Sequence, residues 1–321
     1  MIKVSHVETH VVGEEGIARA IERLRAGALV ALPTETVYGL AALATRADSV
    51  AAIFAAKGRP ANNPLIVHVA DGGGARTVVR EWPAIAQTLA EAFWPGPLTL
   101  VLPRGASIPD VVTAGLDTVA VRAPAHPLFR RVLEATGPLA APSANRSNAV
   151  SPTRAEHVLA SLGGRIELIL DGGPCEVGIE STVLSLVGTP TVLRRGAITP
   201  EMLRAHIGDV AVRDGIAEGA RPSPGMSARH YAPDAEVVFV PRGDDQALRA
   251  AMRDDAGALV HTLEHARALR LPDEPMAFAH GLYAALHELD ARHARIVIEQ
   301  VPDAPEWAAV ADRLRRAGRL E

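Results

Sequence analysis

The chain has 321 residues, of which 48% are hydrophobic, and a formal net charge of −4 at pH 7. A chain of this size can bury a large core and is expected to form two domains. The slight acidic excess argues against a basic coat for bulk nucleic-acid binding, although it allows a local basic cleft. The single cysteine, Cys175, excludes an internal disulfide and a Cys-based zinc cluster.

The first two-thirds of the chain alternates short apolar runs with amphipathic segments, which predicts α/β layers. One helix is expected over residues 16–25. Another should begin near Asp48 and Ser49 and end at Gly58, which can adopt the left-handed conformation. The other helices expected here are 83–93, 127–136, 153–162 and one that begins at Thr199-Pro200. The expected strands are 28–32, 65–69, 98–102, 118–121, a short strand before Pro142, 168–170, 183–187 and 191–194.

The character of the sequence changes at residues 213–233, which are rich in Gly and Pro and show no periodicity. A segment this long is typical of a linker or of a lid over a ligand. The strands expected beyond it are 237–240, 258–261 and 295–298, and the helices are 244–252, 281–292 and 306–317. We therefore predict a catalytic domain over 1–212, a linker or lid over 213–235, and a smaller α/β domain over 236–321.

Neither common phosphate-binding fingerprint occurs, because the chain contains no Gly-Lys-Ser or Gly-Lys-Thr and no Gly-x-Gly-x-x-Gly after a strand. A nucleotide would have to be held by separate side chains at strand ends. Only Lys3 and Lys57 are lysines among 33 basic residues. A lysine in mid-domain indicates a place for a compact, mobile charge, and Arg59 follows two residues later. The alternative is that Lys57 complements the dipole of its own helix.

Several single residues have two interpretations. Ser143 and Asn145, two apart on an extended loop, could both bind one ligand or could form an ordinary turn. Arg122 ends a strand, and its planar guanidinium suits a carboxylate ligand or a structural ion pair. His68 lies within an apolar strand, where it could be catalytic or simply part of the core. Tyr231 could stack on a base or anchor the linker.

Five segments taken together resemble the YrdC-type threonylcarbamoyl-AMP synthase family. They are Pro-Thr-Glu-Thr-Val-Tyr-Gly-Leu at 33–40, Lys-Gly-Arg at 57–59 with Asn-Pro-Leu-Ile-Val-His at 63–68, Pro-Ser-Ala-Asn at 142–145, Glu-Ser-Thr-Val at 180–183 and Leu-Arg-Arg-Gly at 193–196. The linker segments 223–226 and 230–233, with the α/β tail, are similar to the longer, two-domain form. The resemblance implies a YrdC-like twisted mixed sheet with helices, plus a smaller C-terminal Rossmann-like α/β domain.

The resemblance also implies an activity, that of an L-threonylcarbamoyladenylate synthase. Such a nucleotidyltransferase converts L-threonine, bicarbonate and ATP into threonylcarbamoyl-AMP and pyrophosphate. Mg²⁺ is expected to enter with ATP, with no metal ligand assigned to the protein itself. The product would pass to a downstream tRNA-modifying transferase complex for the threonylcarbamoyladenosine modification of tRNA. We expect a cytoplasmic protein with no membrane segment and no stable nucleic-acid binding.

By matching positions, the resemblance implies that Lys57 and Arg59 are catalytic cations on the phosphates. The residues implied for L-threonine are Thr36, His68, Arg122, Ala141 and Ser181. Those implied for ATP are Arg59, Asn63, Thr118, Ser143, Asn145, Ser151, Arg194 and Tyr231. Where relatives commonly read Arg-Pro-Gly, this chain reads Arg194-Arg195-Gly196. We assign the nucleotide contact to Arg194, with Arg195 as the alternative.

An alternative function is an RNA-binding or ribosome-associated module, since YrdC-like folds have a concave face that could hold RNA. The acidic net charge, three Trp and three Tyr offer little for an extended electrostatic and stacking surface. A carbamoyl-transfer maturation enzyme would need zinc-binding Cys clusters, which Cys175 alone does not supply. The role of the second domain, the oligomeric state, the general base and the choice between threonine and serine are left open by the sequence.

Overall fold

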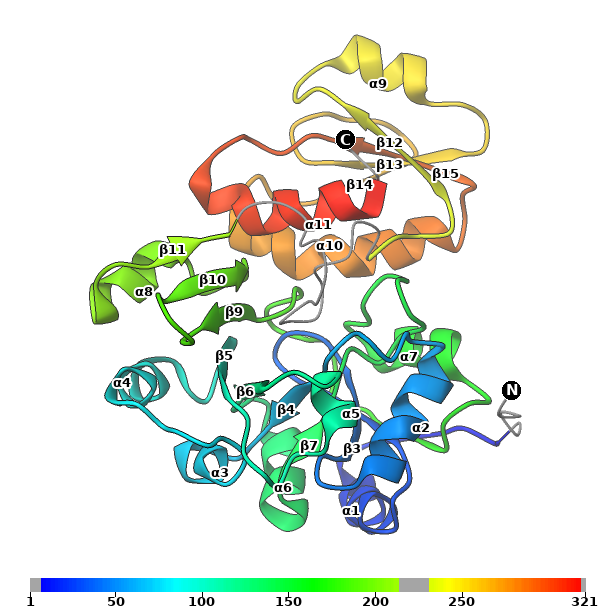
Figure 1. Cartoon of the computed structure of the whole chain (residues 1–321). Helices are drawn as coiled ribbons and strands as arrows, with labels where there is room; N and C mark the ends of the chain where they lie inside the picture. The colour runs from blue at the N-terminus through cyan, green and yellow to red at the C-terminus, as the bar shows by residue number, and fades with distance from the viewer. Residues whose placement is uncertain (1–6, 214–230, 319–321) are drawn as a thin grey trace.

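The computed structural model describes residues 7–213 and 231–318, which form two sheets with helices around them (Figure 1). The larger sheet has 11 strands in the order β1-β8-β2-β3-β7-β4-β6-β5-β9-β10-β11, and parallel and antiparallel neighbours are mixed in it. The smaller sheet has four parallel strands in the order β12-β15-β13-β14. The expected mixed α/β fold with a second, smaller α/β unit is confirmed.

The larger sheet extends to residue 212 and is accompanied by eight α-helices within the first described stretch. Its strands are β1 (His10–Val12), β2 (Val30–Leu32), β3 (Gly39–Leu43), β4 (Ile66–His68), β5 (Leu98–Pro103), β6 (Thr118–Arg122), β7 (Leu139–Ala140), β8 (Leu168–Leu170), β9 (Thr182–Ser185), β10 (Thr191–Arg194) and β11 (Ala211–Val212). The helices are α1 (Ile17–Arg25), α2 (Ala47–Lys57), α3 (Gly72–Arg76), α4 (Ala84–Phe93), α5 (Asp110–Thr113), α6 (Pro127–Thr136), α7 (Ala155–Leu162) and α8 (Pro200–Ile207), with the short 3-10 helix η1 (Glu14–Gly16) before α1.

Helix α2 delivers the chain to the site. It ends as expected at Gly58, which is left-handed with φ 62°. Its start differs from the expectation, because the capping position is Arg46 and not Asp48 or Ser49. The Asp48 carboxylate instead accepts a hydrogen bond of 2.6 Å from the Arg46 guanidinium within the first turn. The helix therefore begins slightly earlier and keeps an acidic residue near its positive end.

The centre of the larger sheet explains why the site forms where it does. Strand β4 lies parallel to β6, and their register pairs His68 with Arg122 at the strand ends. Strand β7 runs antiparallel to β4 and leads into the segment at 141–145. These strands are buried, as expected for the middle of a sheet covered on both faces. The carboxyl ends of β4 and β6 therefore present polar side chains together.

The second unit consists of the four-stranded sheet and three α-helices, two of which lie between it and the larger sheet in Figure 1. Its elements are β12 (Glu236–Val240), α9 (Asp245–Ala251), β13 (Ala256–Val260), β14 (Ala268–Arg270), α10 (Pro275–Asp290), β15 (Arg295–Glu299), the 3-10 helix η2 (Pro305–Trp307) and α11 (Ala308–Gly318). One hydrophobic cluster joins the units, since Val37 and Ile179 pack with Phe278 and Tyr283.

Most of the predicted linker or lid, residues 214–230, lies outside the described residues, and the lid hypothesis therefore has no structural description here. Beyond it, Tyr231 is buried at 1% exposure, and Ala232 forms an isolated parallel bridge with Ala149. Within 7–213 and 231–318, no helix combines the length and the apolar character that crossing a membrane requires.

Candidate active site

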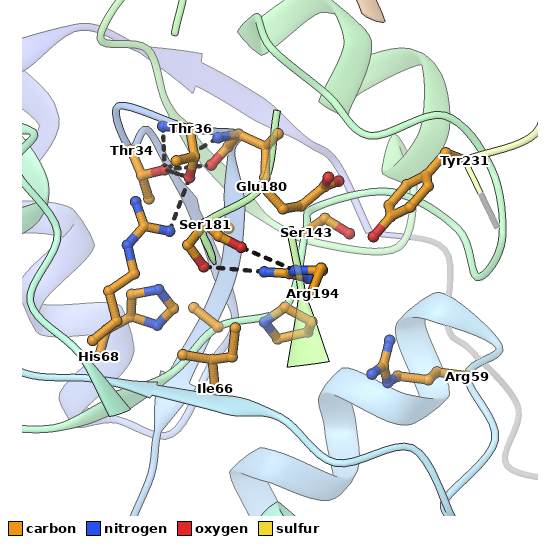
Figure 2. Close-up of a pocket in the computed structure, with 15 residues that line it drawn as sticks. Thr34, Thr36, Arg59, Ile66, His68, Ser143, Glu180, Ser181, Arg194 and Tyr231 are labelled. Carbon is orange, nitrogen blue, oxygen red and sulfur yellow. Dashed lines mark hydrogen bonds between the residues drawn. The ribbon is translucent and has the colours of Figure 1, made fainter. Parts of the chain in front are cut away.

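A pocket lies at the ends of β4 and β6 (Figure 2), and together with the open solvent at its mouth it comprises about 520 Å³ not occupied by atoms. Loops after β2 and β7 and before β9 complete it, together with β10 and the start of the second described stretch. Its lining carries three arginines and one glutamate, which gives it a net positive charge. The lining residues are Thr34, Thr36, Val37, Gly39, Arg59, Ile66, His68, Arg122, Ala141, Pro142, Ser143, Glu180, Ser181, Arg194 and Tyr231.

The loop after β2 is folded around the Thr34 hydroxyl. Its oxygen accepts hydrogen bonds from the backbone N–H groups of Thr36 at 3.1 Å and Val37 at 3.2 Å. The same hydroxyl lies 2.8 Å from that of Thr36. Serine and threonine hydroxyls often stabilise turns in this way. The Thr36 hydroxyl is thereby fixed in the pocket wall, where it accepts a hydrogen bond of 2.9 Å from Nη1 of Arg122.

Arg122 is a buried cation with partners on several sides. Its Nη2 lies 2.7 Å from Oε1 of Glu35, and both side chains are at most 5% exposed. Its Nε donates to the carbonyl oxygen of Gly96 at 3.2 Å. A buried charge is costly without a partner, and the Glu35 carboxylate supplies the opposite charge beside the guanidinium. Of the two interpretations of Arg122, the ion pair is observed, and the side chain also lines the pocket.

His68 is a neutral residue of the same wall. Burial, with a smaller contribution from the positive charge of Arg122, lowers the pKa of His68 to about 3. Its ring packs against that of Phe129 with centroids 5.3 Å apart. Among the described residues, its Nδ1 has no hydrogen-bond partner. A buried ring nitrogen without a partner can bind a small polar ligand in the pocket.

Ser181 and Arg194 form a second polar group in the pocket (Figure 2). Arg194 donates from Nε to the carbonyl oxygen of Ser181 and from Nη2 to its hydroxyl, both at 3.0 Å. The Ser181 hydroxyl also lies 2.7 Å from that of Thr99 on β5. Burial lowers the pKa of Arg194, although arginine remains a cation at neutral pH. The pair thus offers a hydroxyl and a positive charge together.

Arg59 and Lys57 diverge after helix α2. Arg59 lines the pocket, and its Nε and Nη2 donate to the carbonyl oxygens of Asn63 at 3.2 Å and Pro64 at 3.0 Å. Burial lowers the pKa of Arg59 to about 10, so it is charged at neutral pH. An extended chain past Gly58 would have placed both cations on one side. The left-handed turn at Gly58 separates them instead.

Lys57 holds the loop that follows β7. Its Nζ donates to the carbonyl oxygens of Ser143 and Asn145, and its side chain does not line the pocket. Burial, reinforced by the charge of Arg59, lowers the pKa of Lys57. Asn145 fixes the same loop, because its Nδ2 donates to the carbonyl oxygens of Arg146 at 2.9 Å and Ala149 at 2.8 Å. Ser143 is thereby held at the pocket.

The pocket brings together many of the residues predicted from the sequence. The residues predicted for L-threonine that line it are Thr36, His68, Arg122, Ala141 and Ser181. The residues predicted for ATP that line it are Arg59, Ser143, Arg194 and Tyr231. Arg194 lies in this pocket, whereas Arg195 lines a separate cavity beside α11.

The other residues predicted for ATP lie outside the pocket lining. Thr118 begins β6, at the opposite end of that strand from Arg122. The Ser151 hydroxyl donates to Glu180 at 2.6 Å. Asn63 and Asn145 are buried, and each has a side-chain oxygen with no partner among the described residues.

Sequence reasoning assigned no role to Thr34, Glu35 or Glu180. The Thr34 turn had a weak local signal, because a threonine hydroxyl can bind the backbone N–H two residues further along the chain. Glu35 and Glu180 had none, since their cationic partners Arg122 and Arg313 lie far along the chain. Buried carboxylates of this kind become visible only when the tertiary structure is known.

Comparisons with known proteins agree with this geometry. The family model described as Telomere recombination (Sua5, YciO and YrdC) matches residues 22–196, and the model described as Threonylcarbamoyl-AMP synthase, C-terminal domain, matches residues 198–318. The chain is 41% identical over 310 residues to a threonylcarbamoyl-AMP synthase of Pyrococcus abyssi, covering 92% of this chain and 91% of that protein. It is also 41% identical over 320 residues to that of Bacillus subtilis, covering 94% and 92%.

A solved structure is similar over nearly the whole fold. It is the crystal structure of P. abyssi Sua5 complexed with L-threonine, with a TM-score of 0.89 and 39% sequence identity. The similarity covers 97% of this chain and 98% of that one. The two family models and these relatives extend across both units of the fold. The chain therefore belongs to the threonylcarbamoyl-AMP synthase family, in its two-domain form.

Proposed function

We propose that this chain makes threonylcarbamoyl-AMP and pyrophosphate from L-threonine, bicarbonate and ATP. The observation that carries the proposal is the pocket itself, because it gathers hydroxyls and arginines predicted for an amino acid and for a nucleotide on one surface. Full-length relatives named for this activity support it. The product would serve a downstream tRNA-modifying transferase complex in the cytoplasm.

L-Threonine would occupy the part of the pocket around Arg122. The guanidinium suits the substrate carboxylate, and the Thr36 hydroxyl beside it is fixed by the Thr34 turn. The neutral His68 and the Ser181 hydroxyl would bind the remaining polar groups of threonine. Ala141 would limit the space left for the side chain.

ATP would occupy the part of the pocket around Arg59, Arg194 and Tyr231. The two arginines would bind phosphate oxygens, Ser143 would donate a hydrogen bond, and Tyr231 would contact the base. The unpartnered oxygens of Asn63 and Asn145 are available nearby for the nucleotide or its bound water. Thr118 and Ser151, which do not line the pocket, stay as predicted contacts that only a bound nucleotide can test.

Magnesium would enter with the phosphates and not through a protein cage. In the described stretches, no group of three or more His, Cys, Asp or Glu side chains could hold a metal ion. Mg²⁺ usually keeps several waters and binds through substrate phosphates, which is compatible with a pocket rich in arginine. Bound there, it would offset charge on the leaving pyrophosphate.

The chemistry requires positioning and charge stabilisation. The threonine amine attacks the carbon of bicarbonate with loss of water, or that of carbon dioxide with loss of a proton, and gives a carbamate. A carbamate oxygen then attacks the α-phosphorus of ATP, and the bond from that phosphorus to the departing pyrophosphate breaks. No covalent enzyme intermediate is needed. The contribution of the protein would be to hold the reactants in line and to stabilise the negative charge through Arg59 and Arg194, with Lys57 holding the adjacent loop.

The experiment that tests this function is an assay of pyrophosphate release from ATP across a panel of amino acids, with and without bicarbonate. We expect release that requires both L-threonine and bicarbonate, with serine as the closest competitor to compare. Pyrophosphate release that is independent of bicarbonate would contradict the proposal. Tight, salt-sensitive RNA binding without pyrophosphate release would favour the alternative of an RNA-binding module.

A further inference from the structure

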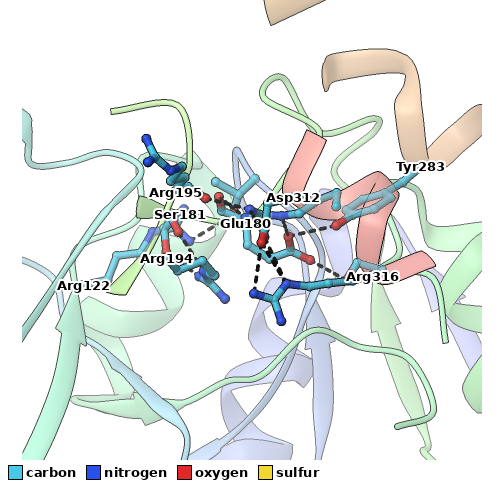
Figure 3. A network of polar contacts seen from close by, with 11 residues as sticks. Arg122, Glu180, Ser181, Arg194, Arg195, Tyr283, Asp312 and Arg316 are labelled. Carbon is cyan, nitrogen blue, oxygen red and sulfur yellow. Dashed lines mark hydrogen bonds and ion pairs between the residues drawn. The ribbon is translucent and has the colours of Figure 1, made fainter. Parts of the chain in front are cut away.

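One wall of the pocket is held from the C-terminal domain (Figure 3). The carboxylate of Glu180, which lines the pocket, is fully engaged on both oxygens. Its Oε2 accepts hydrogen bonds from the Tyr283 hydroxyl of α10 at 2.9 Å and from Nε of Arg313 of α11 at 3.0 Å. Its Oε1 accepts from the Ser151 hydroxyl at 2.6 Å. Two helices of the second domain thus determine where this carboxylate lies.

Arg313 makes further contacts with the same wall. Its side chain is 0% exposed, and Nη1 donates to the carbonyl oxygen of Arg195 at 2.7 Å. Its Cζ lies 5.5 Å from the centroid of the Tyr231 ring, which lines the pocket. A guanidinium over an aromatic face is an attractive arrangement. Arg313 therefore contacts a pocket carboxylate, the ring of Tyr231 and the backbone immediately after Arg194.

Helix α10 reinforces the arrangement one turn beyond Tyr283. His287 lies with Nε2 3.1 Å from the carbonyl oxygen of Ser151, so α10 contacts Ser151 directly and also through Glu180. The buried charge of Arg313 is balanced by Glu180 and by Asp312, whose carboxylate lies 3.3 Å from Nη1. The cluster is satisfied as a unit, and removing one member would leave buried groups without partners.

These contacts fall on one half of the pocket. They reach Ser151, Tyr231 and, through the neighbouring backbone, Arg194, which are residues predicted for ATP. On the threonine half, the ion pair between Arg122 and Glu35 lies within the first domain. The second domain reaches this half through the packing of Val37 against Phe278 and Tyr283 and through a long hydrogen bond of 3.4 Å from Nη2 of Arg313 to the carbonyl oxygen of Glu180, next to Ser181. The two halves of the pocket therefore differ in how strongly the second domain supports them, because its short polar contacts go to Glu180 and Tyr231.

We propose that Arg313 and Tyr283 are positioning residues that hold the nucleotide half of the active site, so that docking of the C-terminal domain sets the affinity for ATP and affects that for L-threonine much less. This inference rests on the proposed function. Neither residue lines the pocket, and each acts through Glu180 and, for Arg313, through Tyr231. A purely structural interface would instead affect both substrates together.

The test uses the full-length chain with Arg313→Met and Tyr283→Phe, and measures ATP and L-threonine binding separately by calorimetry, with KM and kcat from pyrophosphate release. For Arg313→Met we expect kcat/KM for ATP to fall by about 10- to 100-fold, the scale of a small misplacement of positioned groups. The dissociation constant for L-threonine should stay within about twofold. Tyr283→Phe should change ATP binding in the same direction but less, because Arg313 still contacts Glu180.

The matched control is Arg295→Met, which removes the ion pair between Arg295 and Glu236 inside the same domain, away from the pocket. It should leave both affinities unchanged. Arg313→Lys keeps the charge without the planar fork and should recover part of the ATP affinity. If Arg313→Met does not fold, Tyr283→Phe and Arg313→Lys decide the question.

Two results would overturn the inference: unchanged ATP affinity in folded Arg313 and Tyr283 variants, or equal losses for ATP and L-threonine. Either outcome is distinct from failure of the proposed function. If the proposed function failed, the unsubstituted chain itself would release no pyrophosphate in a threonine- and bicarbonate-dependent way.

Discussion

The two sheets both end in clusters of polar residues, but only the larger sheet presents them to a pocket predicted to bind substrates. In the smaller sheet, Glu299 ends β15 and is 0% exposed. Its carboxylate accepts hydrogen bonds from the backbone N–H groups of Gly243 at 3.0 Å, His261 at 2.8 Å and Thr262 at 2.9 Å. It also accepts one from the Thr262 hydroxyl. His261 in turn has Nδ1 2.9 Å from the carboxylate of Asp273.

The difference is in how completely these groups satisfy one another. The Glu299 cluster is closed, since donors surround the carboxylate and hold the loops after three strands together. In the larger sheet, His68, Asn63 and Asn145 each keep a buried polar atom without a partner among the described residues. Such groups are rare in folded proteins, and a ligand bound in the adjacent pocket would explain these three, whereas Arg23 and Ser49 carry unpaired atoms away from it. In this fold, the polar cluster at the pocket is incompletely paired and the cluster at the smaller sheet is closed.

Arg122→Ala should have the largest effect, because it removes a charge from the pocket and leaves Glu35 buried without its cation. Losing one partner of a buried charge pair costs about 3–5 kcal/mol of stability. We expect affinity for L-threonine to fall by about 10³-fold where the protein still folds. Calorimetry with L-threonine measures this affinity. The control is Arg104→Ala, which removes a more exposed ion pair with Asp110. Unchanged threonine affinity would contradict the assignment.

Lys57→Ala should lower turnover by roughly 10²-fold, the scale of a small misplacement of positioned groups. The effect would act through the loop after β7, because Nζ of Lys57 donates to the backbone carbonyl oxygens of Ser143 and Asn145. Pyrophosphate release at saturating ATP and L-threonine measures it. Lys3→Ala, at the other lysine of the chain, provides the comparison. A rate close to that of the unsubstituted chain would remove Lys57 from the mechanism.

Glu299→Gln should lower stability and leave the pocket unchanged. Burial alone would raise the pKa of Glu299, but the Thr262 hydroxyl and the backbone donors together lower it from 4.5 to about 2. The carboxylate therefore contributes stability above pH 4.5 that is lost as the pH falls through 2. At neutral pH we expect the substitution to cost about 3 kcal/mol, since hydrogen bonds to a charged group are lost.

Urea unfolding at neutral pH and in acid measures the Glu299 effect, because the variant should lose that part of the acid dependence. Binding of ATP and L-threonine to the folded variant should match that of the unsubstituted chain. A loss of substrate affinity at full folding would mean that the closed cluster communicates with the pocket, and the contrast between the two sheets would then fail.

The sequence predicted the elements with clear periodicity or punctuation, and missed those without it. The left-handed end of α2 at Gly58 and the N-terminal cap of α8 at Thr199 follow from local chemistry, and both are confirmed. Strand β3 was missed, because Gly39–Leu43 is rich in small residues and shows no alternation. Helix α3 was missed because its three glycines disfavour a helix.

The pocket residues were predictable where short motifs fixed them to strand ends, as for His68 and Arg122. The direction of Lys57 was not, since it depends on where the loop after β7 lies in three dimensions. The support of Glu180 by Arg313 was not predictable either, because the two residues belong to different domains. Local patterns therefore located the site, and long-range contacts determine how it is held.

The smallest effect is expected from the titration of His68. Burial keeps the pKa of this ring near 3, below its ordinary value of 6.5, so the ring stays neutral in the native protein. Because the unfolded chain would take up a proton as the pH falls through 6.5, burying this neutral ring costs stability increasingly down to pH 3.

Between about pH 5 and 8, the pH dependence of substrate affinity should show no titration of His68, although an ordinary histidine would titrate in that range. We therefore expect His68→Asn to reduce threonine affinity without changing the shape of the pH profile of kcat/KM. Proton NMR of the histidine ring can follow the same group directly. A midpoint near pH 6.5 for His68 would mean that water or a counter-ion reaches the ring. The threonine half of the pocket would then be less closed than the burial of His68 indicates.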